Sequence, residues 1–354
     1  MPKCSHHNSR LSSIALLCIL LLCLCGCGCN LSGSQPSENE CVILTYNVQN
    51  LFDTLVSGNE YPEFTPEGGW TARAYAKRLE TVARTITQGH KYLPDIVVFQ
   101  EIEHIGVLED LLVGPLQSRG YQWYAASDDV GSAIQTGVIS RFPIEGARVH
   151  QSLGIRSALE VEIDINNERI VLFAIHAKSR KEGVAETESK RIELARVISE
   201  RVRQLLRENP LLPIVIAGDF NESADSYFRE EQAMQTALVP ITANKAHTYR
   251  NMGSLMVGGT APSEGCWYTW WLDSSQALMA GSSGSYWYQG VWETFDQILL
   301  SPAFFDRYGT EFKRGYVVSQ DWLFDENGHP CRYEVHKESG VSDHLPVAVV
   351  LSCR

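Results

Sequence analysis

Residues 214–221 read Ile-Val-Ile-Ala-Gly-Asp-Phe-Asn, a short run of β-branched residues that ends in an acid and an amide. Apolar runs of about four to six residues that are rich in Val and Ile are typical of strands buried on both faces. Gly218 permits a close or unusual backbone turn, so Asp219 can point into a crevice. The stretch therefore predicts a buried strand that delivers Asp219 and Asn221 to a site at its end.

The same arrangement recurs along the chain. Other short apolar runs with a polar end occupy residues 42–47, 95–101, 170–176 and 295–300. They place Asn47, Glu101, His176 and Asp296 at the ends of predicted strands, and Asp343-His344 follows near the C-terminus. A strand end is rigid, and side chains there face a crevice shared with neighbouring strands, so we expect one convergent site.

Two helices are also predicted, because apolar residues recur at helical spacing between residues 75 and 86 and between residues 192 and 205. Residues 158–165 alternate between apolar and polar, so we expect an outer strand with one solvent-exposed face. Helices interleaved with buried strands predict an α+β fold with two packed, mixed β-sheets flanked by helices, a four-layer α/β/β/α sandwich.

Several segments together resemble the endonuclease/exonuclease/phosphatase superfamily, of the deoxyribonuclease-I-like type. They are Thr45-Tyr-Asn-Val, Phe99-Gln-Glu, His176-Ala-Lys-Ser, Gly218-Asp-Phe-Asn-Glu, Phe295-Asp-Gln-Ile-Leu-Leu-Ser and Ser342-Asp-His-Leu-Pro. Each motif alone is weak, but all occur in the order of that family and span residues 42–351. The resemblance implies a phosphoesterase in which water attacks phosphorus in line.

The resemblance also implies a divalent cation, Mg²⁺ or Mn²⁺. Glu101 would be its principal ligand, and Asn47 and Asp343 would help directly or through water. A carboxylate at a strand end suits such a hard cation, which takes oxygen ligands. Taken alone, Glu101 could equally be a solvated acid at the end of a strand.

Catalytic roles follow from the same resemblance. Asp219 would polarise the attacking water and Asn221 would orient the phosphate or the nucleophile. His176 and His344 would contact the scissile phosphate from two sides, with Asp296 supporting His344. An imidazole beside a carboxylate can donate to a phosphate oxygen or move a proton near neutral pH.

Each of these motifs has a structural alternative. His176 alone could be a satisfied core residue, and Gly-Asp-Phe-Asn alone could be a plain turn. Two further residues are candidates for phosphate contact. Arg156 could form a surface ion pair instead, and Lys178 could lie in a solvated loop.

The N-terminus differs from the rest of the chain. Lys3 and Arg10 precede a short apolar run that is typical of an export signal. Leu24-Cys25-Gly26-Cys27 then resembles the bacterial lipobox, which implies lipidation at Cys27. We expect a signal and lipobox over residues 1–27, a polar tether over residues 28–40 and a catalytic domain over residues 41–354. The chain would be exported and anchored by its lipid to the outer membrane or cell surface.

Charge and cysteine content set further bounds. The net charge of −12 does not favour non-specific binding of nucleic acid, although bound divalent cations can reverse the sign locally. The predicted domain keeps Cys41, Cys266, Cys331 and Cys353. In an oxidising compartment these four permit two disulfides in three pairings, and the sequence does not choose among them.

Residues 263–293 are rich in aromatic side chains. They could pack in the core, stack on bases, or press a Trp270-Trp271 tip into a lipid surface. We expect a monomeric, extracellular nuclease whose partner is a phosphodiester substrate, nucleic acid first. A sphingomyelinase-like lipid phosphodiesterase or a phosphatase is the alternative. A surface lipoprotein that only binds is the alternative of another class.

Overall fold

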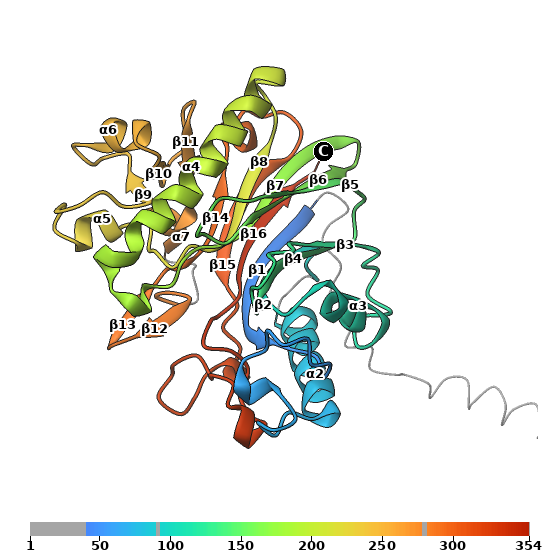
Figure 1. The fold of residues 1–354 in the computed structure, drawn as a ribbon. Coiled ribbons are helices and arrows are strands. Elements are labelled where there is room, and N and C mark those ends of the chain that lie inside the picture. Colours follow the sequence, from blue (N-terminus) through green and yellow to red (C-terminus); the bar gives the residue numbers. More distant parts are fainter. Residues whose placement is uncertain (1–39, 90–92, 278–281, 354) are drawn as a thin grey trace, which may run out of the picture. The chain divides into compact units, whose positions relative to one another are not determined.

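Two mixed β-sheets pack against each other in the structure, a computed structural model that describes residues 40–89, 93–277 and 282–353 (Figure 1). The predictions for the leader, for Cys27 and for nearly all of the tether fall on residues 1–39, outside the described residues. Short runs of Val, Ile and Leu form the central strands, as expected for strands buried on both faces.

The first sheet has six strands in the order β15-β16-β1-β2-β4-β3. Their bounds are β1 (Glu40–Leu51), β2 (Ile96–Ile102), β3 (Trp123–Ala126), β4 (Gln135–Ser140), β15 (Glu311–Val317) and β16 (Val347–Ser352). The first and last strands of the described chain, β1 and β16, are antiparallel neighbours, and β1 also runs parallel to β2.

The second sheet has eight strands in the order β5-β6-β7-β8-β14-β11-β10-β9. Their bounds are β5 (Ile144–His150), β6 (Ala158–Ile165), β7 (Glu168–His176), β8 (Ile214–Asp219), β9 (Leu238–Pro240), β10 (Leu255–Gly258), β11 (Cys266–Tyr268) and β14 (Asp296–Leu300). A separate hairpin pairs β12 (Tyr286–Tyr288) with β13 (Val291–Glu293).

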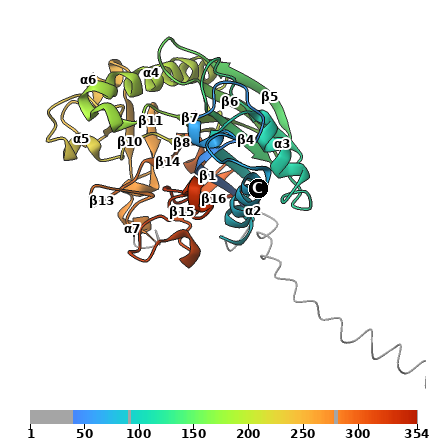
Figure 2. The same cartoon turned by 60° about the horizontal axis from the view of Figure 1, so that its bottom comes forward.

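Helices cover the outer faces of both sheets. The α-helices are α2 (Ala72–Gln88), α3 (Ile105–Val113), α4 (Val184–Glu208), α5 (Ser226–Arg229), α6 (Ala246–Asn251) and α7 (Ser274–Ala277). The 3₁₀ turns are η1 (Pro62–Phe64), η2 (Arg180–Glu182), η3 (Trp270–Leu272), η4 (Pro302–Phe305), η5 (Asp321–Leu323) and η6 (Val335–Lys337). Figure 2 shows the strands between α4 on one side and α2 and α3 on the other. The predicted four-layer sandwich is therefore confirmed.

Two apolar clusters hold these layers together. One joins the facing sides of the two sheets to α2 and α3, and the other joins α4 to the outer face of β7 and β8. The strand predicted for residues 158–165 forms as β6, but it is not the outermost strand and its polar face is only partly exposed. β6 lies between β5 and β7, and Glu160 is buried because Arg201 of α4 binds both of its carboxylate oxygens at 2.8 Å.

Among the described residues, no helix combines the length and the apolar character needed to cross a membrane.

Candidate active site

Strand register brings three of the predicted residues into one row. β7 runs parallel to β8 with His176 opposite Asp219, and β14 runs antiparallel to β8 with Asp296 opposite Asp219. The three side chains therefore lie side by side across neighbouring strands, near the place where each strand begins or ends. Asn47 and Glu101 reach the same place from the facing sheet, because β1 and β2 end there.

Asp219 is the centre of this group and is almost fully buried. Its Oδ1 accepts from the backbone N–H of Asn221 at 2.7 Å, and its Oδ2 accepts from the amides of Asn47 and Asn221, both at 3.1 Å. Burial raises the pKa of Asp219 to about 7, against the lowering effect of His344 and these hydrogen bonds. An acid with a pKa near neutrality is suited to accept a proton from water.

The two histidines differ in their charge state. Nδ1 of His344 lies 2.8 Å from Oδ2 of Asp296, and its Nε2 lies 3.8 Å from Oδ2 of Asp219. Burial opposes the charged ring, but Asp296 and Asp219 raise the pKa of His344 to about 10. Burial and the nearby Arg156 and His344 charges hold the pKa of His176 well below its usual value. The site therefore has one cationic and one neutral imidazole near neutral pH.

Glu101 forms the other side of the site. Its Oε1 accepts from Nδ2 of Asn47 at 3.2 Å and its Oε2 accepts from the backbone of Asn50 at 3.1 Å. The backbone of Glu101 has φ of 65°. A residue other than glycine adopts this left-handed conformation only at a cost in free energy. Strain of this kind at the end of a buried strand is typical of a functional position.

The donor set around Glu101 fits a divalent cation. Burial and the negative charge of Asp343 both raise the pKa of Glu101, so the two carboxylates are near enough to repel each other. A hard cation held by Glu101 and Asp343 would relieve this repulsion. Asn47 uses its amide nitrogen on Glu101 and Asp219 and its oxygen on the backbone of Gln49 at 3.0 Å, so here it positions the acids.

A cavity of about 360 Å³ contains most of these groups in its lining. The predicted residues in that lining are Glu101, Arg156, His176, Asp219, Asn221, Asp343 and His344. Asp296 lies behind His344, and Asn47 lies behind Glu101 and Asp219. The cavity of about 760 Å³ between α4 and β10–β11 contains none of the predicted site residues.

Of the two candidate phosphate-contacting residues, Arg156 lies at the cavity and Lys178 does not. Arg156 lines the cavity, where its Nη1 donates to the backbone oxygen of Ala177 at 3.0 Å. Lys178 is not part of the lining, and its Nζ lies 2.5 Å from Oε1 of Glu182. The structure thus places Lys181, rather than Lys178, at the cavity.

Several lining residues carry no sequence signal. They are Gln49, Asn50, Tyr61, Glu63, Lys181, Tyr286 and Arg332. They come from strand ends, short 3₁₀ turns and loops, where no periodicity identifies the face that a side chain will occupy. Tyr286 is the clearest case, since its ring lies 4.5 Å from the ring of His344. Tyr286 belongs to the aromatic-rich segment 263–293, but no spacing within that segment identifies the ring that meets His344, so only the fold reveals this contact.

Gly218 allows Asp219 to take its place, and we predict that Gly218→Ala lowers stability by roughly 2–4 kcal/mol. The backbone of Gly218 has φ of 152°, and a Cβ there would meet the backbone oxygen of Ile175 at 2.0 Å. Thermal unfolding measures the loss. Gly131→Ala is the matched control, because Gly131 also has positive φ but faces open space. Equal losses in the two variants would contradict the proposed clash.

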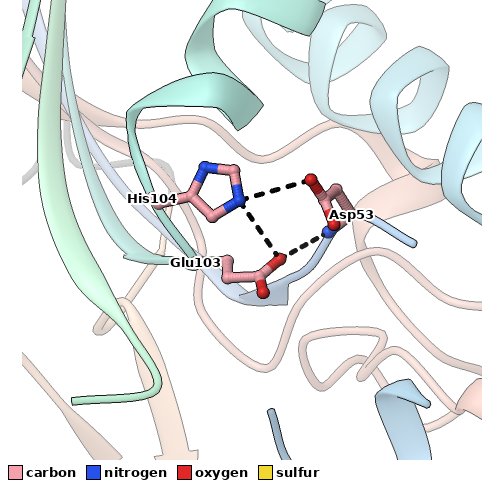
Figure 3. Close-up of side chains that lie close together, drawn as sticks. All are labelled: Asp53, Glu103 and His104. Atoms are coloured by element: carbon pink, nitrogen blue, oxygen red, sulfur yellow. Dashed lines mark hydrogen bonds and ion pairs between the residues drawn. The ribbon is translucent and has the colours of Figure 1, made fainter. Parts of the chain in front are cut away.

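A second group of ionisable residues follows the ends of β1 and β2. Figure 3 shows His104 beside Asp53 and Glu103, with its Nε2 3.2 Å from Oδ2 of Asp53. The three potential ligand atoms lie within 4.8 Å of one another, which is compatible with a metal ion. However, Nδ1 of His104 accepts from the backbone of Gly106 and caps α3, so Nε2 carries the proton. A hydrogen bond from Nε2 of His104 to Asp53 accounts for this cluster.

The strand order and the polar strand ends invite comparison with known proteins. Residues 42–353 match the Endonuclease/Exonuclease/phosphatase family. The chain belongs to this family. The resemblance seen in the sequence motifs is therefore confirmed. Members of the endonuclease/exonuclease/phosphatase family are hydrolases that act on phosphoester bonds and use divalent metal ions.

Several solved structures share the fold. D. rerio TDP2 humanised by 14 mutations is 14% identical, with 88% of this chain and 99% of that chain covered and a TM-score of 0.52. Truncated Caenorhabditis elegans TDP2 is 17% identical, with coverages of 89% and 98% and a TM-score of 0.52. A family protein from Bacteroides thetaiotaomicron is 17% identical, with coverages of 89% and 95% and a TM-score of 0.50. No curated protein matches the chain.

Proposed function

We propose that this endonuclease/exonuclease/phosphatase protein is an exported, lipid-anchored, Mg²⁺- or Mn²⁺-dependent phosphodiesterase whose substrate is nucleic acid. One observation carries the catalytic part of the proposal. Asn47 donates to both Glu101 and Asp219, and His344 lies 3.8 Å from Asp219, so the three groups can act on a single phosphate. A divalent cation held by Glu101 and Asp343 would supply positive charge to the phosphate oxygens.

The protein's own residues account for the proton and charge transfers. Asp219 accepts a proton from the attacking water, and the amide of Asn221 donates to Asp219 and holds its orientation. The imidazolium of His344, held by Asp296, donates to a non-bridging oxygen as negative charge develops. The neutral His176 ring, which lies 3.6 Å from Asp219, can donate a hydrogen bond from the opposite side. No covalent intermediate is needed.

The aromatic residues favour nucleic acid over a lipid substrate. Trp267, Tyr268 and Trp270 are buried in the core, and Trp271 donates from Nε1 to the backbone oxygen of Asp296 at 3.0 Å. The interpretation of Trp270-Trp271 as an exposed, lipid-binding tip is therefore wrong. The core-packing interpretation holds for the residues before the β12–β13 hairpin.

The hairpin instead offers a stacking surface beside the cavity. Tyr286 and Tyr288 alternate along β12, so they share one face, and their rings are 6.1 Å apart at 19°. Tyr286 lines the cavity against His344, while Tyr288 is 47% exposed. The row of rings therefore leads from the reaction centre outward, where an unpaired base next to the scissile phosphate can stack.

We predict that Tyr288→Ala raises KM for a single-stranded oligonucleotide by about 5–150-fold, because one stacking contact contributes about 1–3 kcal/mol. The kcat is expected to change little, since Tyr288 lies outside the cavity lining. Steady-state kinetics measure both constants. Tyr288→Phe should retain the wild-type KM, and Tyr308→Ala removes a 78%-exposed tyrosine from another surface as a control. An unchanged KM in Tyr288→Ala would exclude the stacking role.

We predict that Glu101→Gln weakens Mn²⁺ binding by at least about tenfold, because it removes the charge of the main ligand. Calorimetric titration of the purified protein with Mn²⁺ measures affinity without relying on turnover. Glu182→Gln, which changes an exposed acid paired with Lys178, is the matched control. Wild-type affinity in Glu101→Gln would show that the cation binds elsewhere.

A substrate panel tests the function as a whole. The purified chain is incubated with Mg²⁺ and, separately, plasmid DNA, single-stranded DNA, RNA and sphingomyelin vesicles. Cleavage of a nucleic acid that EDTA abolishes supports the proposal, whereas hydrolysis of vesicles alone supports the lipid phosphodiesterase. No turnover of any substrate supports a binding lipoprotein.

The location is tested by replacing the expected lipidation site. Cys27→Ala should move the protein from the membrane fraction to the soluble fraction and abolish incorporation of labelled palmitate. Unchanged fractionation together with unchanged labelling would contradict anchoring through Cys27.

A further inference from the structure

The first and last strands of the described chain bring two cysteines together. β1 and β16 pair antiparallel, with Glu40 opposite Ser352 and Cys41 opposite Leu351. Opposite residues share a face of the sheet, as do residues two apart on one strand. Cys41 and Cys353 therefore project from the same face as diagonal neighbours. Cys353 follows the last residue of β16, so its backbone is outside the regular ladder.

The two thiols are neighbours in the fold and are shielded from solvent. Both side chains belong to the same apolar cluster, with exposed fractions of 0% and 4%, and the two thiols are close enough to shift each other's pKa. The neighbouring Cys41 thiol lowers the pKa of Cys353, although burial acts in the opposite direction. The Cys353 thiol in turn raises the pKa of Cys41, as does burial. Cys353 is thus the better nucleophile of the pair.

The other two described cysteines occupy different parts of the fold. Cys266 begins β11 in the other sheet, within the small cluster beneath α6, and its sulfur lies 3.5 Å from the hydroxyl of Ser263. Cys331 lies between η5 and η6, where its backbone donates to Leu323. Among the four described cysteines, Cys41 and Cys353 are therefore the pair that the fold brings together.

We propose that Cys41 and Cys353 form an intramolecular disulfide that joins the first strand of the domain to the last. The proposal rests on the exported location proposed above, because cytosolic thiols are kept reduced. The oxidant is a protein or small-molecule disulfide. The Cys353 thiolate attacks one of its sulfurs and releases the other as a thiol, and the Cys41 thiolate then displaces the remaining thiol from Cys353. The pair loses two protons and two electrons, which reduce one disulfide of the oxidant.

The crosslink would act on the strands that carry the site. β1 ends in the segment that contains Asn47, and Asp343-His344 lies just before β16. A disulfide between residues 41 and 353 closes nearly the whole domain into one loop, which lowers the conformational entropy of the unfolded chain. It also links β1, the strand that follows the predicted tether, covalently to the residue that follows the last strand, β16.

One digest distinguishes every pairing. Free thiols are blocked with N-ethylmaleimide in intact cells, and the full chain is purified in detergent and cleaved after Glu without reduction. Cleavage after Glu40, Glu60, Glu264, Glu293, Glu326, Glu334 and Glu338 puts the four cysteines on four peptides, residues 41–60, 265–293, 327–334 and 339–354. Mass spectrometry should find peptide 41–60 joined to peptide 339–354.

The result is overturned if both peptides carry maleimide or if either is joined to another cysteine peptide. A second sample of the same protein is equilibrated with oxidised and reduced glutathione. It shows whether the two cysteines can form a disulfide at all, independently of the redox state of the cell compartment. A crosslink that forms only in this buffer overturns the disulfide in the cell and indicates a reducing location. Maleimide on both peptides in both samples overturns the pairing itself.

Thermal unfolding provides an independent readout. Dithiothreitol should lower the Tm of the purified wild type by roughly 5–10 °C, because the closed loop is long. Cys266→Ser and Cys331→Ser should retain this shift, and Cys353→Ser should lose it. If Cys353→Ser fails to fold, the Tm of the reduced wild type is compared with that of the oxidised wild type instead. A Tm that does not respond to reduction in the wild type would contradict the crosslink.

Discussion

Asp219→Asn lowers kcat by about a thousandfold or more, because the variant cannot take a proton from the attacking water. The change is nearly isosteric, but the new amide group faces the donors of Asn47 and Asn221 in place of an acceptor. We therefore also expect a loss of about 1–2 kcal/mol in stability, which is too small to unfold the domain.

Kinetics on single-stranded DNA at saturating Mg²⁺, together with thermal unfolding, separate the two effects. Asp128→Asn changes an exposed acid and should leave both kcat and Tm at their wild-type values. A kcat within about tenfold of the wild type in Asp219→Asn would remove this residue as the general base.

His344→Ala is expected to lower kcat by about a thousandfold, because it removes the cationic donor that faces the phosphate. It also leaves the fully buried carboxylate of Asp296 without its partner at 2.8 Å. Breaking one side of a buried ion pair costs about 3 kcal/mol, so this variant should be clearly less stable than the wild type.

The double variant His344→Ala/Asp296→Asn separates stability from catalysis. Removing the unpaired charge should restore much of the lost Tm, while kcat stays as low as in His344→Ala. If the double variant regained activity with its stability, His344 would have only a structural role. Asp296→Asn alone should give a smaller loss of kcat, since the His344 ring remains present but loses the charge that holds it.

Most of the strands could be predicted because their signals are local. The run 214–219 coincides with β8, and the helical spacing between residues 192 and 205 falls within α4. The polar residues that follow these runs were visible for the same reason. Asp219 and His176 are each the last residue of an apolar strand. The rigid backbone at a strand end restricts the directions in which the side chain can point.

Burial on the second sheet could not be predicted in the same way. The alternation in residues 158–165 correctly indicates a strand, but it does not reveal what covers the polar face. Glu160 is buried because Arg201 comes from a helix 41 residues later in the chain. Trp270 likewise reads as a candidate for an exposed tip and is instead packed against Trp271 at 4.1 Å.

The amino-acid sequence by itself determined the fold class, the family and the acids, amides and histidines of the site, because periodicity and motif order are properties of neighbouring residues. Only the tertiary structure decided how those residues act together. The register of β7, β8 and β14 aligns His176, Asp219 and Asp296. Burial and the nearby Arg156 lower the pKa of His176, whereas Asp296 and Asp219 raise the pKa of His344 against the effect of burial. Contacts between distant strands, such as that of Cys41 with Cys353, depend on chain closure, which no local pattern encodes.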